Sequence, residues 1–121
     1  MKKGHFDVGG QVPEVDDPRV SFQAGLFQDT LPSFVKRFDR DRRTVIHMDA
    51  DLYSATLFVL VWVLPMLEAG DLLIFDEFHD YMDEFRALEH ALRAFPCEVQ
   101  AVAAMPGYAD RGYSRVVLAV K

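Results

Sequence analysis

Two short apolar segments, each followed at once by acidic residues, constrain the fold of this 121-residue chain more than any other feature. Residues 44–48 and 72–75 are rich in β-branched and large apolar side chains, and each segment is too short for a helix of ordinary length. Residues 54–68 lie between them and form a helical stretch, with Gly70 in the usual position after a helix end. Strands that alternate with helices form a parallel sheet.

The same alternation extends along the chain and predicts one α/β domain. We expect about five strands flanked by helices, with the last strand antiparallel to the others, as in a partial Rossmann-like sheet. Residues 1–18 hold several Gly, Pro and Asp residues and are predicted to be irregular. The expected elements are a strand at 19–24, a helix with Asp29 as its cap and Pro32 in its first turn, a strand at 44–48, a helix at 54–68, a strand at 72–75, a helix at 85–95, and strands at 98–103 and 113–120.

Composition excludes several classes of protein. Half of the residues are hydrophobic, which a disordered chain would not show. The longest apolar run, residues 57–67, contains a proline and is shorter than the ~20 residues of a membrane helix. The basic residues of 36–43 alternate with acids, and the net charge is −6, whereas nucleic-acid binding needs a patch of one sign. Cys97 is the single cysteine and no signal peptide follows the N-terminus, so we expect a cytoplasmic protein.

Four carboxylates follow the two apolar strands. In open α/β sheets, ligands bind beyond the carboxyl ends of the strands, and the acids lie at such ends. Carboxylates crowded together repel one another unless a cation joins them, and Mg²⁺ prefers oxygen ligands. Two interpretations stay open: the acids form a metal site, or Asp51 or Ser54 caps the next helix and Asp76 ends its strand in water. The four residues are Asp49, Asp51, Asp76 and Glu77.

His47 lies two residues before Asp49, so both side chains should point to one face of the strand. His47 is either a partner of the acidic site or its proton acceptor, or it is a half-buried histidine with a structural hydrogen bond.

The residues of both acidic turns, together with a segment upstream, resemble the macrocin O-methyltransferase-like (TylF-like) family. The resemblance spans nearly the whole chain, with its motifs in the family's order and spacing. The segments that carry it are Phe6-Asp7-Val8-Gly9-Gly10-Gln11-Val12-Pro13, Gly25-Leu26-Phe27-Gln28-Asp29-Thr30-Leu31-Pro32, His47-Met48-Asp49-Ala50-Asp51-Leu52-Tyr53-Ser54-Ala55-Thr56 and Phe75-Asp76-Glu77-Phe78.

The resemblance implies a class I fold and methyl transfer from S-adenosylmethionine to a hydroxyl of a sugar or another small molecule. Carried over by position, three acids would hold Mg²⁺ and Asp51 would be the general base, with His47 as a second candidate. Gly25 and Phe27 would lie on the cofactor side. The three expected metal ligands are Asp49, Asp76 and Glu77.

The family's first strand, glycine-rich loop and second strand are absent from the sequence. Gly9-Gly10 does not replace the glycine-rich loop, because no apolar strand precedes it. We therefore expect the chain to be the carboxyl-terminal half of the fold, either truncated or one piece of a split enzyme. The family's sheet order would leave a gap of about three strand spacings, ~14 Å, beside residues 44–48. Either residues 19–24 pair there, or another chain does.

The helix at 54–68 is apolar around its whole circumference, which is typical of a helix buried on every side. We therefore expect a homodimer in which Phe58, Val61 and Trp62 meet a second copy. Two other functions stay open: a non-catalytic fragment that serves as an oligomeric or binding module, and a nucleotide-sugar glycosyltransferase with Asp49-Ala50-Asp51 as its metal-binding motif.

Overall fold

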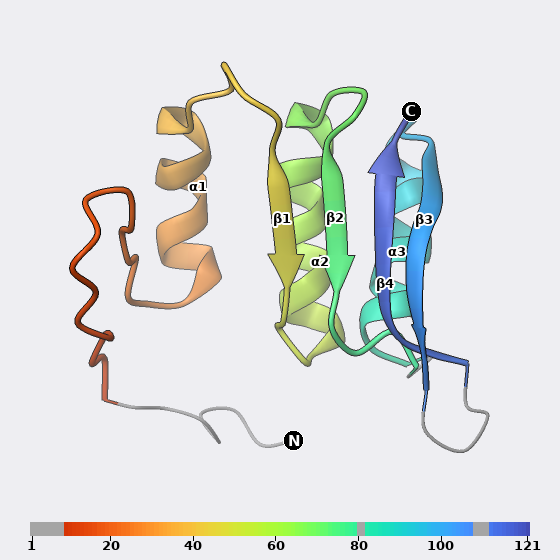
Figure 1. The fold of residues 1–121 in the computed structure, drawn as a ribbon, viewed down its shortest axis with the longest axis horizontal. Helices are drawn as coiled ribbons and strands as arrows, with labels where there is room; N and C mark the ends of the chain where they lie inside the picture. The colour runs from red at the N-terminus through yellow and green to blue at the C-terminus, as the bar shows by residue number, and fades with distance from the viewer. Residues whose placement is uncertain (1–8, 80–81, 108–111) are drawn as a thin grey trace.

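The computed structural model describes residues 9–79, 82–107 and 112–121 as a mixed α/β domain (Figure 1). The start of the segment predicted to be irregular, residues 1–8, lies outside the described residues, and residues 9–18 contain neither helix nor strand. The elements are α1 (Phe27–Arg37), β1 (Val45–Met48), α2 (Tyr53–Val63), the 3₁₀ helix η1 (Leu64–Met66), β2 (Leu72–Phe75), α3 (Glu84–Ala94), β3 (Val99–Pro106) and β4 (Tyr113–Val120).

The described residues form one sheet of four strands in the order β1-β2-β4-β3. β1 and β2 are parallel, with Val45 paired to Leu72 and Met48 to Phe75. β4 runs antiparallel to both of its neighbours, β2 and β3. The predicted α/β class and the antiparallel last strand are therefore confirmed, but the sheet has four strands where about five were expected.

The missing strand is the one predicted at residues 19–24, which form no strand in the structure. Asp17 and Arg19 form a local turn instead: Arg19 donates side-chain hydrogen bonds to the Asp17 carboxylate, and the N–H of Val20 donates to the carbonyl of Asp17. In Figure 1 this segment lies beyond α1, which separates it from β1. A strand needs a neighbouring strand for its backbone hydrogen bonds. Because α1 lies between residues 19–24 and β1, this segment has no strand to pair with.

Helices cover only one face of the sheet. α2 and α3 lie behind the sheet in Figure 1, and α1 lies beyond the edge of β1, where it packs against α2. The covered face holds the core, whose most deeply buried large side chains are Leu60 of α2 and Leu73 and Phe75 of β2. Side chains alternate between the faces of a strand. Val45, which is 53% exposed, therefore lies on the opposite face, which no described element covers.

Both predicted helix boundaries in the first half of the chain need correction. α1 begins at Phe27 without a side-chain cap, so Asp29 lies inside the helix, where its N–H and that of Thr30 donate to the Leu26 carbonyl. Pro32 consequently lies inside the helix and not in its first turn. α2 ends at Val63 and continues only as η1, because Pro65 cannot donate the next helical hydrogen bond.

None of the helices that the structure describes is both long enough and apolar enough to span a bilayer.

Candidate functional site

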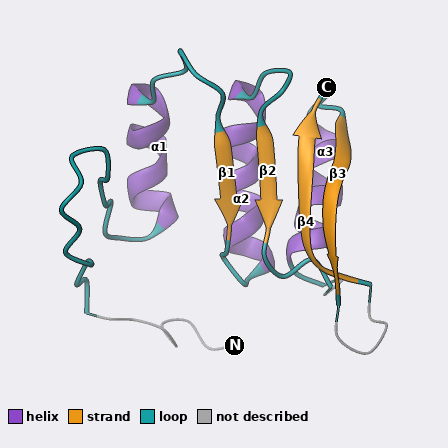
Figure 2. Ribbon diagram, viewed as in Figure 1, coloured by secondary structure: helices purple, strands orange, loops and turns teal. Residues whose placement is uncertain are grey.

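The carboxyl ends of β1 and β2 bring the two acidic turns together at one end of the sheet. The strands are parallel neighbours, and the Asp76 N–H donates to the Met48 carbonyl at 3.2 Å. Asp49 and Asp76 therefore each follow the last residue of adjacent strands. Figure 2 shows both turns as loops at the end to which the arrows of β1 and β2 point. α1 begins at this same end (Figure 1).

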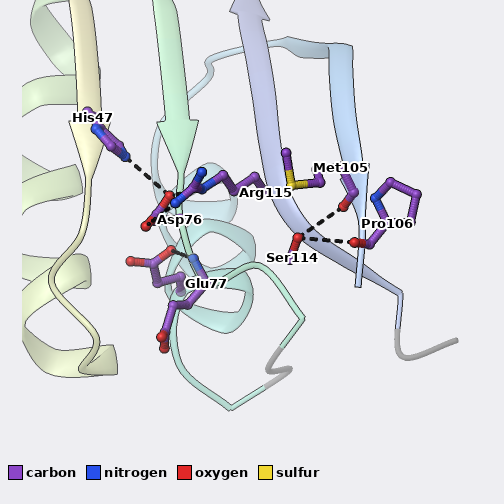
Figure 3. Close-up of polar contacts among 8 residues, drawn as sticks. His47, Asp76, Glu77, Met105, Pro106, Ser114 and Arg115 are labelled. Carbon is purple, nitrogen blue, oxygen red and sulfur yellow. Dashed lines mark hydrogen bonds and ion pairs between the residues drawn. The ribbon is translucent and has the colours of Figure 1, made fainter. Parts of the chain in front are cut away.

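The carboxylate of Asp76 is the centre of the polar contacts in Figure 3. Arg115 of β4 forms hydrogen bonds with both oxygens of this carboxylate: Nε donates to Oδ1, and Nη2 donates to Oδ2 at 3.1 Å. The Nε2 of His47 lies 3.5 Å from Oδ1. The hydrogen bond from Arg115 is the main cause that lowers the pKa of Asp76, and His47 adds to it. Asp76 thus does not end its strand in water.

A fifth carboxyl group, on Glu84 at the start of α3, lies buried behind this site. Its Oε2 accepts the N–H of Glu77 at 3.1 Å, and its side chain has no exposed surface. Its other oxygen, Oε1, has no hydrogen-bond partner among the described residues. Burial raises the pKa of Glu84, against the lowering effect of backbone hydrogen bonds from Glu77 and Ala50; the charges of Glu77 and Asp49 raise it further.

Asp51 is the one non-glycine residue with a positive φ, 56°, in the described part of the chain. The Leu52 N–H donates to the Ala50 carbonyl at 2.6 Å, which closes a three-residue turn around Asp51. The left-handed region is unfavourable for a residue with a Cβ, and such strain concentrates at functional sites. The conformation of Asp51 therefore agrees with a functional role for this turn.

The structural interpretation of Asp51 and Ser54 as helix caps is wrong. The residue at the cap position of α2 is Leu52, and no side chain there makes a capping hydrogen bond. The Tyr53 N–H instead donates to Oδ1 of Asp83, which lies just before α3. Tyr53 also places its hydroxyl 2.8 Å from Nδ1 of His90, so the start of α2 is fixed to α3.

Gly25 and Phe27, predicted on the cofactor side, lie at the start of α1. Gly25 has a φ of 138°, and a Cβ there would lie 3.0 Å from Cγ2 of Thr30. The helix start alone therefore requires this glycine. Phe27 is 41% exposed at the first helical position.

The three acids predicted to bind a metal are not assembled as ligands. The described residues contain no group of three or more His, Cys, Asp or Glu side chains arranged to hold a metal ion. The Asp76 carboxylate accepts a hydrogen bond from Arg115 and lies beside His47, and Glu77 is exposed. As arranged, Asp49, Asp76 and Glu77 do not fit a divalent cation.

Two residues of the site were not among those predicted from the sequence. Arg115 lies in β4 at an exposed position, and only the β2–β4 register, with Phe75 opposite Val116, shows that it faces Asp76. Glu84 had the pattern of an ordinary acidic residue in the first turn of a helix. Its burial could have been suspected only from the packing of α3 against α2.

Fold and site together define an α/β domain with two neighbouring acidic turns at the carboxyl ends of two parallel strands. A model of the macrocin-O-methyltransferase (TylF) family matches residues 11–101, which include both acidic turns. The chain belongs to this family. The glycosyltransferase interpretation of residues 49–51 has no support from this membership.

Two O-methyltransferases are similar to the chain. It is 34% identical over 76 residues to a mycinamicin III 3''-O-methyltransferase of Micromonospora griseorubida, an overlap that covers 55% of this chain and 28% of the relative. It is 33% identical over 78 residues to an 8-demethyl-8-(2,3-dimethoxy-alpha-L-rhamnosyl)-tetracenomycin-C 4'-O-methyltransferase of Streptomyces olivaceus, covering 57% of this chain and 28% of the relative. The chain spans little more than a quarter of the length of these curated relatives.

Proposed function

We propose that this chain forms the acceptor side of an S-adenosylmethionine-dependent O-methyltransferase that acts on a sugar hydroxyl. One observation carries the proposal: the family match over residues 11–101 includes both acidic turns. The register of β1 and β2 supports it, because that register makes these turns neighbours. Both relatives are named as O-methyltransferases, and the substrate named for one of them carries a rhamnosyl group.

Asp51 is the proposed proton acceptor. Methylation of a hydroxyl requires that its proton leave as the oxygen gains the methyl group, and a positioned carboxylate can take that proton. The turn around Asp51 holds its backbone in a left-handed conformation at the end of β1. His47, the second candidate, has its Nε2 3.5 Å from Asp76, so it would take the proton at Nδ1.

When bound, S-adenosylmethionine supplies the methyl group that the reaction transfers. Among the described residues, Gly25 is explained by the start of α1 and no glycine-rich turn follows a strand, so neither marks a site for it. The remainder of its site would come from protein outside the described residues. No step is assigned to Mg²⁺, because Asp76 is paired with Arg115.

The test is calorimetric titration with S-adenosylmethionine, followed by transfer of a labelled methyl group to glycosides with free hydroxyls. We expect Asp51→Asn to bind the methyl donor as the unmodified chain does but to lose about 10²-fold or more in transfer rate. Asparagine tolerates the left-handed region, so this change removes the charge and keeps the turn. Asp41→Asn, at an exposed loop position beyond the opposite end of the sheet, is the matched control.

If millimolar S-adenosylmethionine fails to bind, the chain by itself is not a methyltransferase. The alternative function, a non-catalytic binding or oligomeric module, would then be favoured. If binding occurs but Asp51→Asn transfers methyl groups at the original rate, the role given to Asp51 is wrong while the family function stands.

A further inference from the structure

The Asp76 carboxylate is already paired with a positively charged side chain, that of Arg115. Two guanidinium N–H groups of Arg115 bond its two oxygens side by side, and His47 approaches Oδ1 from β1 (Figure 3). The Asp76 side chain is 19% exposed, whereas those of Arg115 and His47 are 53% and 55% exposed. Solvent therefore reaches the two positively charged or polar partners more easily than the carboxylate between them.

The backbone fixes this arrangement. Phe75 pairs with Val116 in the antiparallel ladder of β2 and β4, so Asp76 and Arg115 are the next residues outward from that pair. Phe75 and Val116 are buried on the helix-covered face. Alternation then turns Asp76 and Arg115 to the other face, where no described element covers them. The guanidinium needs no movement of the chain to reach its partner.

A bidentate arginine–carboxylate pair uses the same oxygen lone pairs that a metal ion would use. We propose that Arg115 is the resident cation of this site and that it excludes divalent metal from Asp76. The inference rests on the proposed function only in placing Asp76 at the acceptor site. It explains why the acids at these strand ends lie beside one another without a metal-binding arrangement.

Asp49 also favours Arg115 over a divalent cation at this site. Its charge also acts on Arg115 and, with Asp76, favours the charged guanidinium. Removal of the guanidinium would leave Asp49 and Asp76 at adjacent strand ends without their main counter-charge. Such a pair of carboxylates attracts a divalent cation.

The experiment measures Mn²⁺ binding by the decrease of the free-ion electron paramagnetic resonance signal, without methyl donor or acceptor. We expect Arg115→Met to bind Mn²⁺ about tenfold or more tightly than the unmodified chain, because charge-assisted hydrogen bonds to Asp76 no longer compete. Arg115→Lys keeps a cation and should restore most of the exclusion. Adding Asp76→Asn to Arg115→Met should abolish the gain. Arg93→Met, which removes an exposed arginine paired with Glu89, is the matched control and should change nothing.

Equal Mn²⁺ affinity of the unmodified chain and Arg115→Met overturns the inference, and so does the absence of Mn²⁺ binding in both. Circular dichroism checks that each variant folds. If Arg115→Met does not fold, a second measurement on the unmodified chain decides: titration with Mg²⁺ while the Arg115 Nε–Hε resonance is followed by NMR. The inference requires that Mg²⁺ either does not bind the unmodified chain or shifts that signal in step with binding, and Mg²⁺ binding with an unmoved signal overturns it. Because neither measurement involves methyl transfer, its outcome is independent of whether the chain is an enzyme.

Discussion

Glu84 is the residue whose environment departs most from that of a free side chain. Its carboxyl group is fully buried, yet only one of its oxygens has a hydrogen-bond partner among the described residues. Burial without full pairing is costly for a charged group. Because the carboxyl oxygen accepts the N–H of Glu77, it also holds the second acidic turn against the start of α3.

We expect Glu84→Gln to gain stability relative to the unmodified chain as the pH rises from about 5 to about 7. Burial raises the native pKa of Glu84 above its ordinary value of 4.5. A raised native pKa means that the protonated form stabilises the fold below the ordinary pKa, and that this contribution is lost as the pH rises through the native pKa. Glutamine retains an acceptor for the Glu77 N–H and does not titrate.

The measurement is urea unfolding of both proteins at the two pH values, and the quantity compared is the difference between their free energies of unfolding. Glu89→Gln, on the exposed face of α3, is the control. A difference that stays constant between the two pH values would show that Glu84 is not buried as a titrating group.

Sequence reasoning located the acidic turns but not their partners. The positions of Asp49, Asp51 and Asp76 follow from where apolar strands stop, which is a local property of the chain. Arg115 is 39 residues from Asp76, and the two meet only through a particular register of antiparallel strands. Hydrophobic alternation predicts that a strand exists but not which residue of another strand it will face.

At the scale of elements, Asp71 joins the starts of the two parallel strands. Its Oδ1 accepts the N–H of Thr44, just before β1, at 2.8 Å, and its Oδ2 accepts the N–H of Glu68 at the same distance. Asp71 is only 6% exposed. Two backbone donors at the buried end of the sheet therefore depend on one carboxylate.

Asp71→Ala should lower the free energy of unfolding by about 3 kcal/mol, because it leaves two backbone N–H groups without acceptors. Asp41→Ala, at an exposed position, should change it by less than about 0.5 kcal/mol. Urea unfolding at neutral pH gives both values. Equal stabilities of the two variants would mean that water replaces the carboxylate without loss.

The elements that sequence patterns predicted best are those buried by near neighbours along the chain. Residues 72–75 and 113–120 are strands with the predicted bounds, since their apolar runs lie in the core of the sheet. The prediction failed at residues 19–24, where alternation was present but no adjacent strand was available. The predicted end of α2 is wrong because the prediction followed the apolar run past Pro65. Proline has no backbone N–H, so the α-helix ends before this residue.

As a whole molecule, the domain has one protected sheet edge and one open edge. At the outer strand β3, the register shifts between Ala101 and Ala103, and the strand ends at Pro106, which interrupts further pairing. In the parallel ladder, Thr44 and Met48 bond toward β2, so the backbone groups of Val45 and His47 point to the other side. An apolar groove of about 280 Å³ runs along that side between β1 and α1, lined in part by Leu31, Phe34 and Val45.

The open edge of β1 is the stronger candidate for association than the outer face of α2, because it combines apolar surface with unpaired backbone groups. The α2 face expected to form a homodimer contains half-buried Phe58 and Trp62 and the 42%-exposed Val61. Backbone groups within α2 are already bonded in the helix.

We therefore expect the chain to self-associate at micromolar concentration, and Val45→Lys to shift the midpoint of association to about tenfold higher concentration or more. Val61→Lys should shift it less. Light scattering over a dilution series measures all three proteins. A purely monomeric unmodified chain would refute both surfaces, and a larger effect of Val61→Lys would assign the contact to α2, since the two lysines add the same charge and differ only in the surface they occupy.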